Sequence, residues 1–229
     1  LRTNDGEKIV QMMKELGLEH LQLNLGGLVG KDSATIDAET QRYRSAGITL
    51  TAGMVGFAGE NYSSIAMIRE TGGLVPDKLW PARREVALQA GQVAAAMGIS
   101  RVTTHVGFIP TSNSPGYPIM IQRMTEIARA WANQGILLIM ETGQEAADEL
   151  LKFLNDLGCR NVGVNFDPAN MILYGAGDPI EAVHTLGRHI RHVHIKDAVM
   201  SDQPGVTWGK EVPFGQGQVG AAAFLNALR

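Results

Sequence analysis

The sequence lacks the features that disulfide-rich, membrane-spanning and nucleic-acid-binding proteins require. Its 229 residues include one cysteine, Cys159, so an internal disulfide framework is excluded and a reducing, cytoplasmic setting is expected. No apolar run approaches the roughly 20 residues of a membrane-spanning helix. The formal net charge of −3, with no lysine-rich run, offers no basic surface to a nucleic acid. We therefore expect neither a membrane nor a nucleic acid as partner, although Leu at position 1 leaves a removed signal peptide open.

What the sequence does contain is a regular alternation of short apolar segments and amphipathic ones, at the spacing of βα units. The predicted strands cover residues 20–25, 48–55, 101–107, 136–141, 162–167 and 192–197. The predicted helices cover about 5–16, 36–46, 81–97, 118–134, 142–157, 178–187 and the segment from 219 onward. This pattern is typical of the α/β class and favours one domain over residues 1–229.

Two helix starts and three long connections carry further information. Thr142-Gly143-Gln144-Glu145 has the spacing of a capping box, and Asp178-Pro179-Ile180-Glu181 repeats that spacing with proline at the first helical position. Loops are predicted at residues 56–80, 108–118 and 199–217. The first of them is too long for a plain linker, which favours a lid.

Three of the predicted strands end in side chains that bind divalent metals, namely Glu141, Asp167 and His194. In a ring of parallel strands these ends converge on one pocket. Two carboxylates and an imidazole form a mixed oxygen and nitrogen site that leaves room for substrate oxygens. We therefore predict a site for one divalent ion, which could be Mn, Mg, Co or Zn. Each residue also has a purely structural interpretation, as a solvated strand end or a loop starter.

Alternation within the strands predicts which side chains point into the ring. Leucines at 21, 23 and 25 would pack on the helices, so Gln22 and Asn24 would point inward. The same alternation gives three more inward sets: Thr103 with His105, Asn165 with Asp167, and His192 and His194 with Lys196. A purely structural core would not need these polar side chains, and they indicate a common pocket.

At this point the residues resemble the xylose-isomerase-like TIM-barrel superfamily of sugar isomerases and epimerases. The resemblance spans nearly the whole chain and rests on the order and spacing of five motifs: His105-Val106-Gly107, Glu141-Thr142-Gly143, Asn165-Phe166-Asp167-Pro168-Ala169-Asn170, His192-Val193-His194-Ile195-Lys196-Asp197 and Pro213-Phe214-Gly215-Gln216-Gly217. It implies a (β/α)8 TIM barrel in which Glu141, Asp167 and His194 are three of the four protein ligands of the metal. It also implies that Glu141 shuttles a proton. The fourth ligand of the family is a glutamate at the end of the eighth strand.

The sequence departs from the family pattern in three respects. Six strands can be counted where the barrel needs eight. We therefore expect the chain to lack the first and eighth strands, and the domain to be incomplete at both ends, because a six-stranded remnant would expose two sheet edges. Asn170 stands where several epimerases have histidine, and Gln216 lies in a Gly-x-Gly turn that often holds glutamate. The last two departures concern the substrate more than the reaction class.

Four residues beside the ligands are candidates for substrate binding: His105, Lys196, Asn170 and Glu60. Three of them, His105, Lys196 and Glu60, have a plainer alternative. An inward histidine is often a satisfied core residue, a lysine at the mouth can be a surface residue, and a glutamate in a loop is usually solvated. Glu145 is best explained by the capping box. Trp80 and Trp208 could stack on a sugar ring or anchor their loops, with anchoring favoured for Trp80.

The resemblance implies a divalent-metal-dependent isomerase or epimerase that acts on a sugar, sugar phosphate or keto-polyol through an enediolate intermediate. One alternative is a metal-dependent dehydratase of the keto-inositol or dehydroshikimate type, since the same intermediate can lose a β-hydroxyl. Another is a non-catalytic barrel that binds sugar or metal. The abasic-site endonuclease branch fits poorly, because it needs more histidines and a basic groove. The expected partner is a small carbohydrate, and a homo-oligomer remains open.

Overall fold

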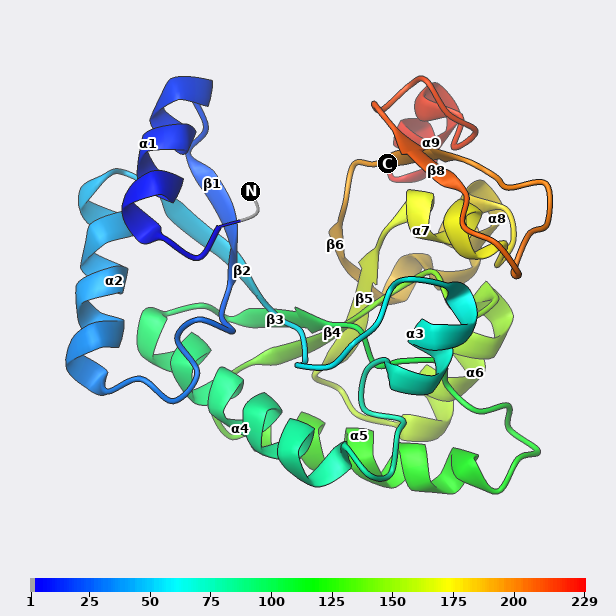
Figure 1. The fold of residues 1–229 in the computed structure, drawn as a ribbon, viewed down its shortest axis with the longest axis horizontal. Helices are drawn as coiled ribbons and strands as arrows, with labels where there is room; N and C mark the ends of the chain where they lie inside the picture. Colours follow the sequence, from blue (N-terminus) through cyan, green and yellow to red (C-terminus); the bar gives the residue numbers. More distant parts are fainter. Residues whose placement is uncertain (1–2) are drawn as a thin grey trace.

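Six parallel strands form one curled sheet in the computed structural model, which describes residues 3–229 (Figure 1). They are β1 (His20–Asn24), β2 (Thr49–Val55), β3 (Arg101–Thr104), β4 (Leu137–Glu141), β5 (Val162–Phe166) and β6 (Ile190–Val193). Each strand pairs with the next one along the chain, as successive right-handed βα units require. The predicted parallel strands of a TIM barrel are therefore confirmed.

Helices follow the strands and cover the outer face of the sheet (Figure 1). They are α1 (Gly6–Leu16), α2 (Ser33–Ser45), α3 (Ile65–Thr71), α4 (Trp80–Met97), α5 (Gly116–Ala132), α6 (Ala147–Leu157), α7 (Pro168–Tyr174), α8 (Pro179–Leu186) and α9 (Ala221–Ala227), with a short 3-10 turn at Gly187–His189. Among residues 3–229, no helix combines the length and the apolar character needed to cross a membrane.

Local sequence signals explain two of these helices. The Asp5 side chain accepts hydrogen bonds from the backbone N–H groups of Glu7 and Lys8 at the start of α1, and Gly17 ends that helix in the left-handed region at a φ of 65°. Asp178 caps α8 in the same way, with Pro179 at its first position. The helix start predicted at residue 178 is therefore confirmed.

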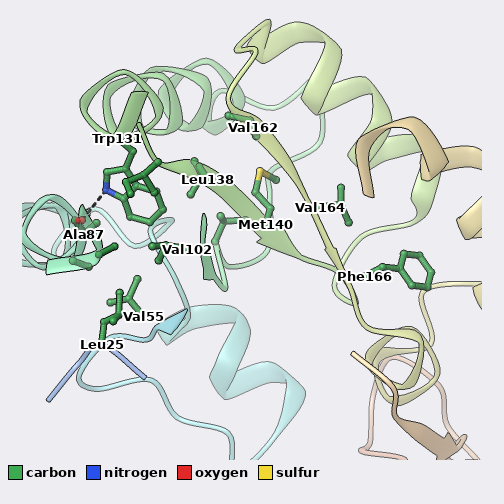
Figure 2. Close-up of a cluster of buried hydrophobic side chains, with 14 of the residues drawn as sticks. Leu25, Val55, Ala87, Val102, Trp131, Leu138, Met140, Val162, Val164 and Phe166 are labelled. Atoms are coloured by element: carbon green, nitrogen blue, oxygen red, sulfur yellow. Dashed lines mark hydrogen bonds between the residues drawn. The ribbon is translucent and has the colours of Figure 1, made fainter. Parts of the chain in front are cut away.

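The main core lies between the outer face of the sheet and the helices (Figure 2). Alternate strand residues such as Leu138, Met140, Val164 and Phe166 point into it and are fully buried. The indole of Trp131 on α5 donates a hydrogen bond to the carbonyl oxygen of Ala87 on α4 at 2.9 Å, and this bond joins the two helices. Because these residues face outward, their strand neighbours face the interior of the ring.

Within residues 3–229 the sheet stays open, with β1 and β6 at its two edges. The chain therefore carries six of the eight strands of a closed barrel, as the strand count predicted.

The capping box predicted at Thr142 is wrong. Helix α6 starts later, at Ala147, and its N-cap residue Ala146 makes no side-chain hydrogen bond. The Thr142 hydroxyl instead accepts from the backbone N–H of Asp167 at 2.8 Å and donates to the carbonyl oxygen of the same residue at 3.2 Å. The hydroxyl that the predicted helix cap would have used therefore joins the end of β4 to the end of β5.

Three predicted connections contain regular structure. The sixth strand ends at Val193, four residues before the predicted end, and residues 197–199 form β7 (Asp197–Val199), which pairs antiparallel with β8 (Lys210–Val212) inside the predicted loop 199–217. The Asp-Pro step after β5 starts α7, whereas a loop was expected there. The connection 56–80 contains α3. These short elements depend on contacts between segments far apart in the chain, and the alternation of apolar and polar residues cannot predict such contacts.

Candidate metal centre

The three predicted metal ligands lie together at the ends of neighbouring strands. Glu141 is the last residue of β4, Asp167 directly follows β5, and His194 directly follows β6. Their ligand atoms lie within 4.8 Å of one another. Nδ1 of His194 is 3.3 Å from Oε1 of Glu141 and 3.2 Å from Oδ2 of Asp167. Both carboxylates are buried. This juxtaposition follows from the parallel order β4-β5-β6, which brings the three strand ends to one edge.

The His194 ring is oriented by a residue on the opposite edge of the sheet. Its Nε2 lies 2.8 Å from Oε1 of Gln22 on β1, and the two residues are 172 positions apart in the sequence. Because a carbonyl oxygen only accepts hydrogen bonds, Nε2 carries a proton toward Gln22, and Nδ1 faces the two carboxylates. Gln22 thus points inward, as alternation predicted, and its role on His194 was not expected.

Asn170 on α7 holds one oxygen of Glu141. Its Nδ2 donates to Oε1 of Glu141 and to the carbonyl oxygen of Thr142, both at 3.2 Å. This approach requires glycine at position 143, where φ is 139° and an added Cβ would lie 2.5 Å from the Cβ of Asn170. The Glu141-Thr142-Gly143 motif therefore supplies a ligand, a hydroxyl that joins β4 to Asp167, and the space for Asn170.

The charges of the centre support a cation at this position. Burial raises the pKa of Glu141, but His105, His194 and Lys196 outweigh it and bring that pKa down to about 2. Burial lowers the pKa of His194, but hydrogen bonds and charge from Asp167 and Glu141 raise it to about 9. The carboxylates thus hold positive charge on the imidazole.

One carboxylate oxygen of Glu141 also supports a metal ion at this site. Oε2 of Glu141 is buried and has no hydrogen-bond partner in the described part of the chain. A buried carboxylate oxygen without a partner is costly, and a metal ion or a substrate group would satisfy it. Two carboxylates and one imidazole also form a donor set that divalent ions accept. The residues present therefore fit a divalent metal.

A cavity of about 640 Å³ opens above the three ligands. Glu141, His194 and Asn170 lie at its floor. It is also lined by the other predicted contacts, His105, Glu60 and Lys196, and by residues that the sequence had not singled out for this role: Met54, Gly56, Leu173, Tyr174, Val193, Ile195 and Glu211. Of the side chains predicted to point inward, His105, His194 and Lys196 line this cavity, whereas His192 lines a different one beside α8 and β6.

Glu60 and His105 line the cavity in different ways. The two carboxylate oxygens of Glu60 accept hydrogen bonds from the backbone N–H groups of Phe57 and Gly73, at 3.0 and 2.9 Å. These bonds hold the loop after β2. Because both oxygens already accept hydrogen bonds, the main contribution of Glu60 to the cavity is its negative charge. Nε2 of His105 lies 3.6 Å from Oε2 of Glu141, and its buried Nδ1 has no partner among residues 3–229.

Lys196 links the metal centre to the β7–β8 hairpin. Its Nζ is 3.4 Å from Oδ2 of Asp167 and 2.9 Å from Oε2 of Glu211 on β8. Burial lowers the pKa of this ammonium, but the two carboxylates raise it above its usual value. Sequence analysis missed Glu211 because it lies in a predicted loop.

Three aromatic side chains, Tyr62, Tyr174 and Trp208, form one wall of the cavity. The indole N–H of Trp208 donates to the carbonyl oxygen of Tyr62 at 3.1 Å and joins two loops that are 146 residues apart. The ring of Tyr174 meets Trp208 edge-on, with 4.9 Å between centroids. Trp208 thus anchors its loop and also lines the cavity, and stacking on a sugar ring stays a prediction.

The Gly215-Gln216-Gly217 turn is fixed by Asp197. One oxygen of that carboxylate accepts from the backbone N–H groups of Gly215 and Gly217, and the other accepts from those of Ala198 and Val219. Burial raises the pKa of Asp197, but these four donors together lower it below its usual value. Gln216 itself is exposed, so this motif shapes the loop around the site.

Comparisons with known proteins agree with this architecture. A family model described as a xylose isomerase-like TIM barrel matches residues 10–229. The solved structure of a xylose isomerase domain protein from Planctomyces limnophilus is 36% identical with a TM-score of 0.93, and the match covers 96% of this chain and 80% of that one. The curated Escherichia coli (strain K12) protein YihM, described as uncharacterized, is 30% identical over 112 residues, or 48% of this chain. That match spans about a third (34%) of the length of YihM.

More distant solved structures share the fold alone. A D-allulose 3-epimerase from Methylomonas sp. in complex with D-allulose is 16% identical with a TM-score of 0.69, covering 97% of this chain and 73% of that one. The probable 3-DHS dehydratase AsbF from Bacillus anthracis is 18% identical, with a TM-score of 0.71 and coverages of 97% and 83%. A Mycobacterium smegmatis barrel protein in complex with magnesium is 17% identical, with a TM-score of 0.70 and coverages of 92% and 72%.

Proposed function

The chain belongs to the xylose isomerase-like TIM-barrel family, and from that premise we propose that it is a divalent-metal-dependent isomerase or epimerase of a sugar, sugar phosphate or keto-polyol. The observation that carries the proposal is the set Glu141, Asp167 and His194, with ligand atoms within 4.8 Å at the floor of a cavity. Distant relatives of the same fold include a sugar epimerase and a protein solved with magnesium.

Glu141, Asp167 and His194 would hold the ion. When bound, a divalent cation supplies Lewis-acid stabilisation of the negative charge that a carbonyl oxygen gains during proton removal at the adjacent carbon. Gln22 holds the imidazole so that Nδ1 faces the other ligands, and Asn170 holds Oε1 of Glu141. The site is thus preorganised by residues from β1 and α7.

Glu141 has the geometry of a proton carrier. Asn170 engages Oε1, while Oε2 has no partner and lies 3.6 Å from Nε2 of His105 at the cavity wall. We assign to Oε2 the removal and return of the proton of the carbon acid. His105 is placed to bind a substrate oxygen beside it, and Lys196 to bind one at the mouth.

A second candidate reaction is dehydration of a keto-polyol in the same cavity. The specific observation in its favour is the Lys196 ammonium, whose Nζ lies 3.4 Å from Asp167 and can protonate a departing β-hydroxyl. The two reactions share proton removal by Glu141 and differ in what leaves afterwards. A dehydratase releases an unsaturated carbonyl compound that absorbs in the ultraviolet, whereas an isomerase or epimerase does not.

Metal stoichiometry is the first test of the proposal. We expect about one divalent ion per chain in the protein and its loss in His194→Ala, measured by elemental analysis after dialysis against Mn²⁺. His184→Ala is the matched control because His184 is exposed on α8. Exchange of a substrate C–H proton with D2O, followed by NMR over a panel of ketoses, then reports the reaction. Equal metal content in the wild type and His194→Ala would contradict the proposed centre.

A further inference from the structure

We propose that the substrate of this cavity is an uncharged polyhydroxy carbonyl compound, and that the cavity rejects the phosphate esters of such compounds. The inference rests on the proposed function and narrows its substrate class. Its basis is the distribution of charge around the cavity, together with the aromatic wall.

The cavity has no free cation to bind a phosphate. Of the described residues that line it, Lys196 is the only lysine or arginine. Its ammonium lies between Asp167 and Glu211, at 3.4 and 2.9 Å. Binding of a phosphate by Lys196 would place that phosphate beside both carboxylates. Phosphate sites usually offer arginine forks, free lysines or backbone N–H groups at a helix start.

Two arginines of the segment between β2 and the end of α4 are occupied by other contacts. Arg83 donates from Nη1 to the carbonyl oxygen of Gly73 at 2.6 Å and from Nη2 to that of Ala58 at 3.0 Å, which holds the loop after β2. The guanidinium of Arg69 lies 4.1 Å from the centre of the Phe108 ring. Both side chains are therefore structural.

Negative charge prevails around the ligand space. Glu60, Glu141 and Glu211 line the cavity, and the buried Asp167 lies beside Glu141 in the cluster of predicted ligands. A bound divalent ion compensates two of these carboxylates, and Lys196 compensates one. A phosphate dianion would enter a site with excess negative charge, where like charges repel.

The same cavity suits neutral hydroxyl compounds. Tyr62, Tyr174 and Trp208 offer ring surface for the C–H groups of a sugar, and carboxylate oxygens accept hydrogen bonds from hydroxyls. Hydroxyl groups donate to carboxylates, whereas a phosphate dianion has no proton to donate. The chemistry of the walls therefore favours the neutral partner.

Binding of matched pairs tests the inference. The Mn²⁺-loaded protein is titrated calorimetrically with D-fructose, D-tagatose and D-allulose and with the 6-phosphate of each. We expect at least one neutral sugar to bind about tenfold or more tightly than its phosphate ester. Equal or tighter binding of the phosphate esters overturns the charge argument and leaves the proposed reaction intact. Binding of neither set to metal-loaded protein overturns the proposed function together with the inference.

Glu211→Gln separates charge selection from general changes in the fold. The substitution removes one carboxylate from Lys196, and we expect the preference for the neutral sugar to fall by about tenfold. Glu149→Gln is the control, since Glu149 is exposed on α6 outside the cavity and carries the same formal charge. An unchanged preference in Glu211→Gln, or an equal change in the control, contradicts the role of Glu211.

Discussion

At the scale of single residues, the site depends on side chains that hold the ligands in place as much as on the ligands themselves. Gln22 sets the orientation of His194, Thr142 binds the backbone of Asp167 on both sides of its peptide group, and Asn170 holds Glu141. Such contacts would fix the orientation of the three side chains before a metal binds.

Asn170→Ala tests this positioning. The substitution frees Oε1 of Glu141 and removes the bond to the Thr142 carbonyl, so we expect Mn²⁺ affinity to fall by about 10- to 100-fold in calorimetric titration. Asn113→Ala, in the exposed loop before α5, should bind Mn²⁺ like the wild type. Unchanged affinity in Asn170→Ala would show that Glu141 is held without it.

Glu145 is a buried carboxyl group outside the metal centre. Burial raises its pKa from 4.5 to about 8, against the opposing hydrogen bond from the backbone N–H of Ile109 at 2.8 Å. The folded protein thus keeps this proton at neutral pH while the unfolded chain loses it. The sign of the linkage follows: the contribution of Glu145 to stability falls as pH rises from about 4.5 to about 8.

Glu145→Gln should remove this dependence. Gln can still accept from Ile109 and carries no charge, so we expect it to be more stable than the wild type at pH 8, by on the order of 2–4 kcal/mol, with little difference at pH 4.5. The measurement is the difference in free energy of unfolding in urea between the two proteins at each pH. Glu19→Gln is the exposed control, and a constant difference across pH would refute the assignment.

At the scale of elements, the position of α7 against β4 decides whether Asn170 reaches Glu141. The contact needs a residue without a side chain at position 143, both for its φ of 139° and for the close approach of the Asn170 backbone. An element of only seven residues is thus placed by one glycine.

Gly143→Ala should therefore be strongly destabilising. We expect a loss of about 2–4 kcal/mol in free energy of unfolding, together with weaker Mn²⁺ binding, because the added Cβ displaces α7. Gly187→Ala is the matched control: its φ is −41° and an added Cβ meets nothing within 4 Å. That variant should be neutral or more stable by up to about 1 kcal/mol. Similar losses in both variants would contradict the packing argument.

At the scale of the whole molecule, the metal centre joins the ends of β4, β5 and β6, and Gln22 adds β1 from the other edge of the curled sheet. Within residues 3–229 the contact between Gln22 and His194 joins β1 to the β6 end of the sheet, with which β1 shares no backbone hydrogen bonds because it pairs with β2 alone. A ligand bound there should stabilise the fold as a unit.

Divalent metal should therefore raise the unfolding temperature of the protein. At a free Mn²⁺ concentration of about 100 times Kd, the gain in free energy of unfolding is about 2.7 kcal/mol, and EDTA should reverse it. His194→Ala should show no such rise, whereas His184→Ala should behave as the wild type. A rise of equal size in His194→Ala would place the stabilising ion elsewhere.

The sequence by itself determined the run of parallel strands and the three candidate metal ligands. These features are local: strand alternation decides which side faces the ring, and the last residue of a parallel strand lies at the ligand edge. For that reason Glu141, Asp167 and His194 could be identified although they lie far apart in the chain.

Only the tertiary structure decided how the ligands are held and charged. The contacts Gln22–His194, Asn170–Glu141 and Lys196–Glu211 join segments that are far apart in the chain, and no local sequence pattern predicts them. The Thr142 hydroxyl likewise binds the backbone of Asp167 and does not cap a helix. The physical reason is that a polar side chain can choose among several hydrogen-bond partners. It pairs with a buried group that would otherwise have no partner, and which groups are buried is decided only when the chain has folded.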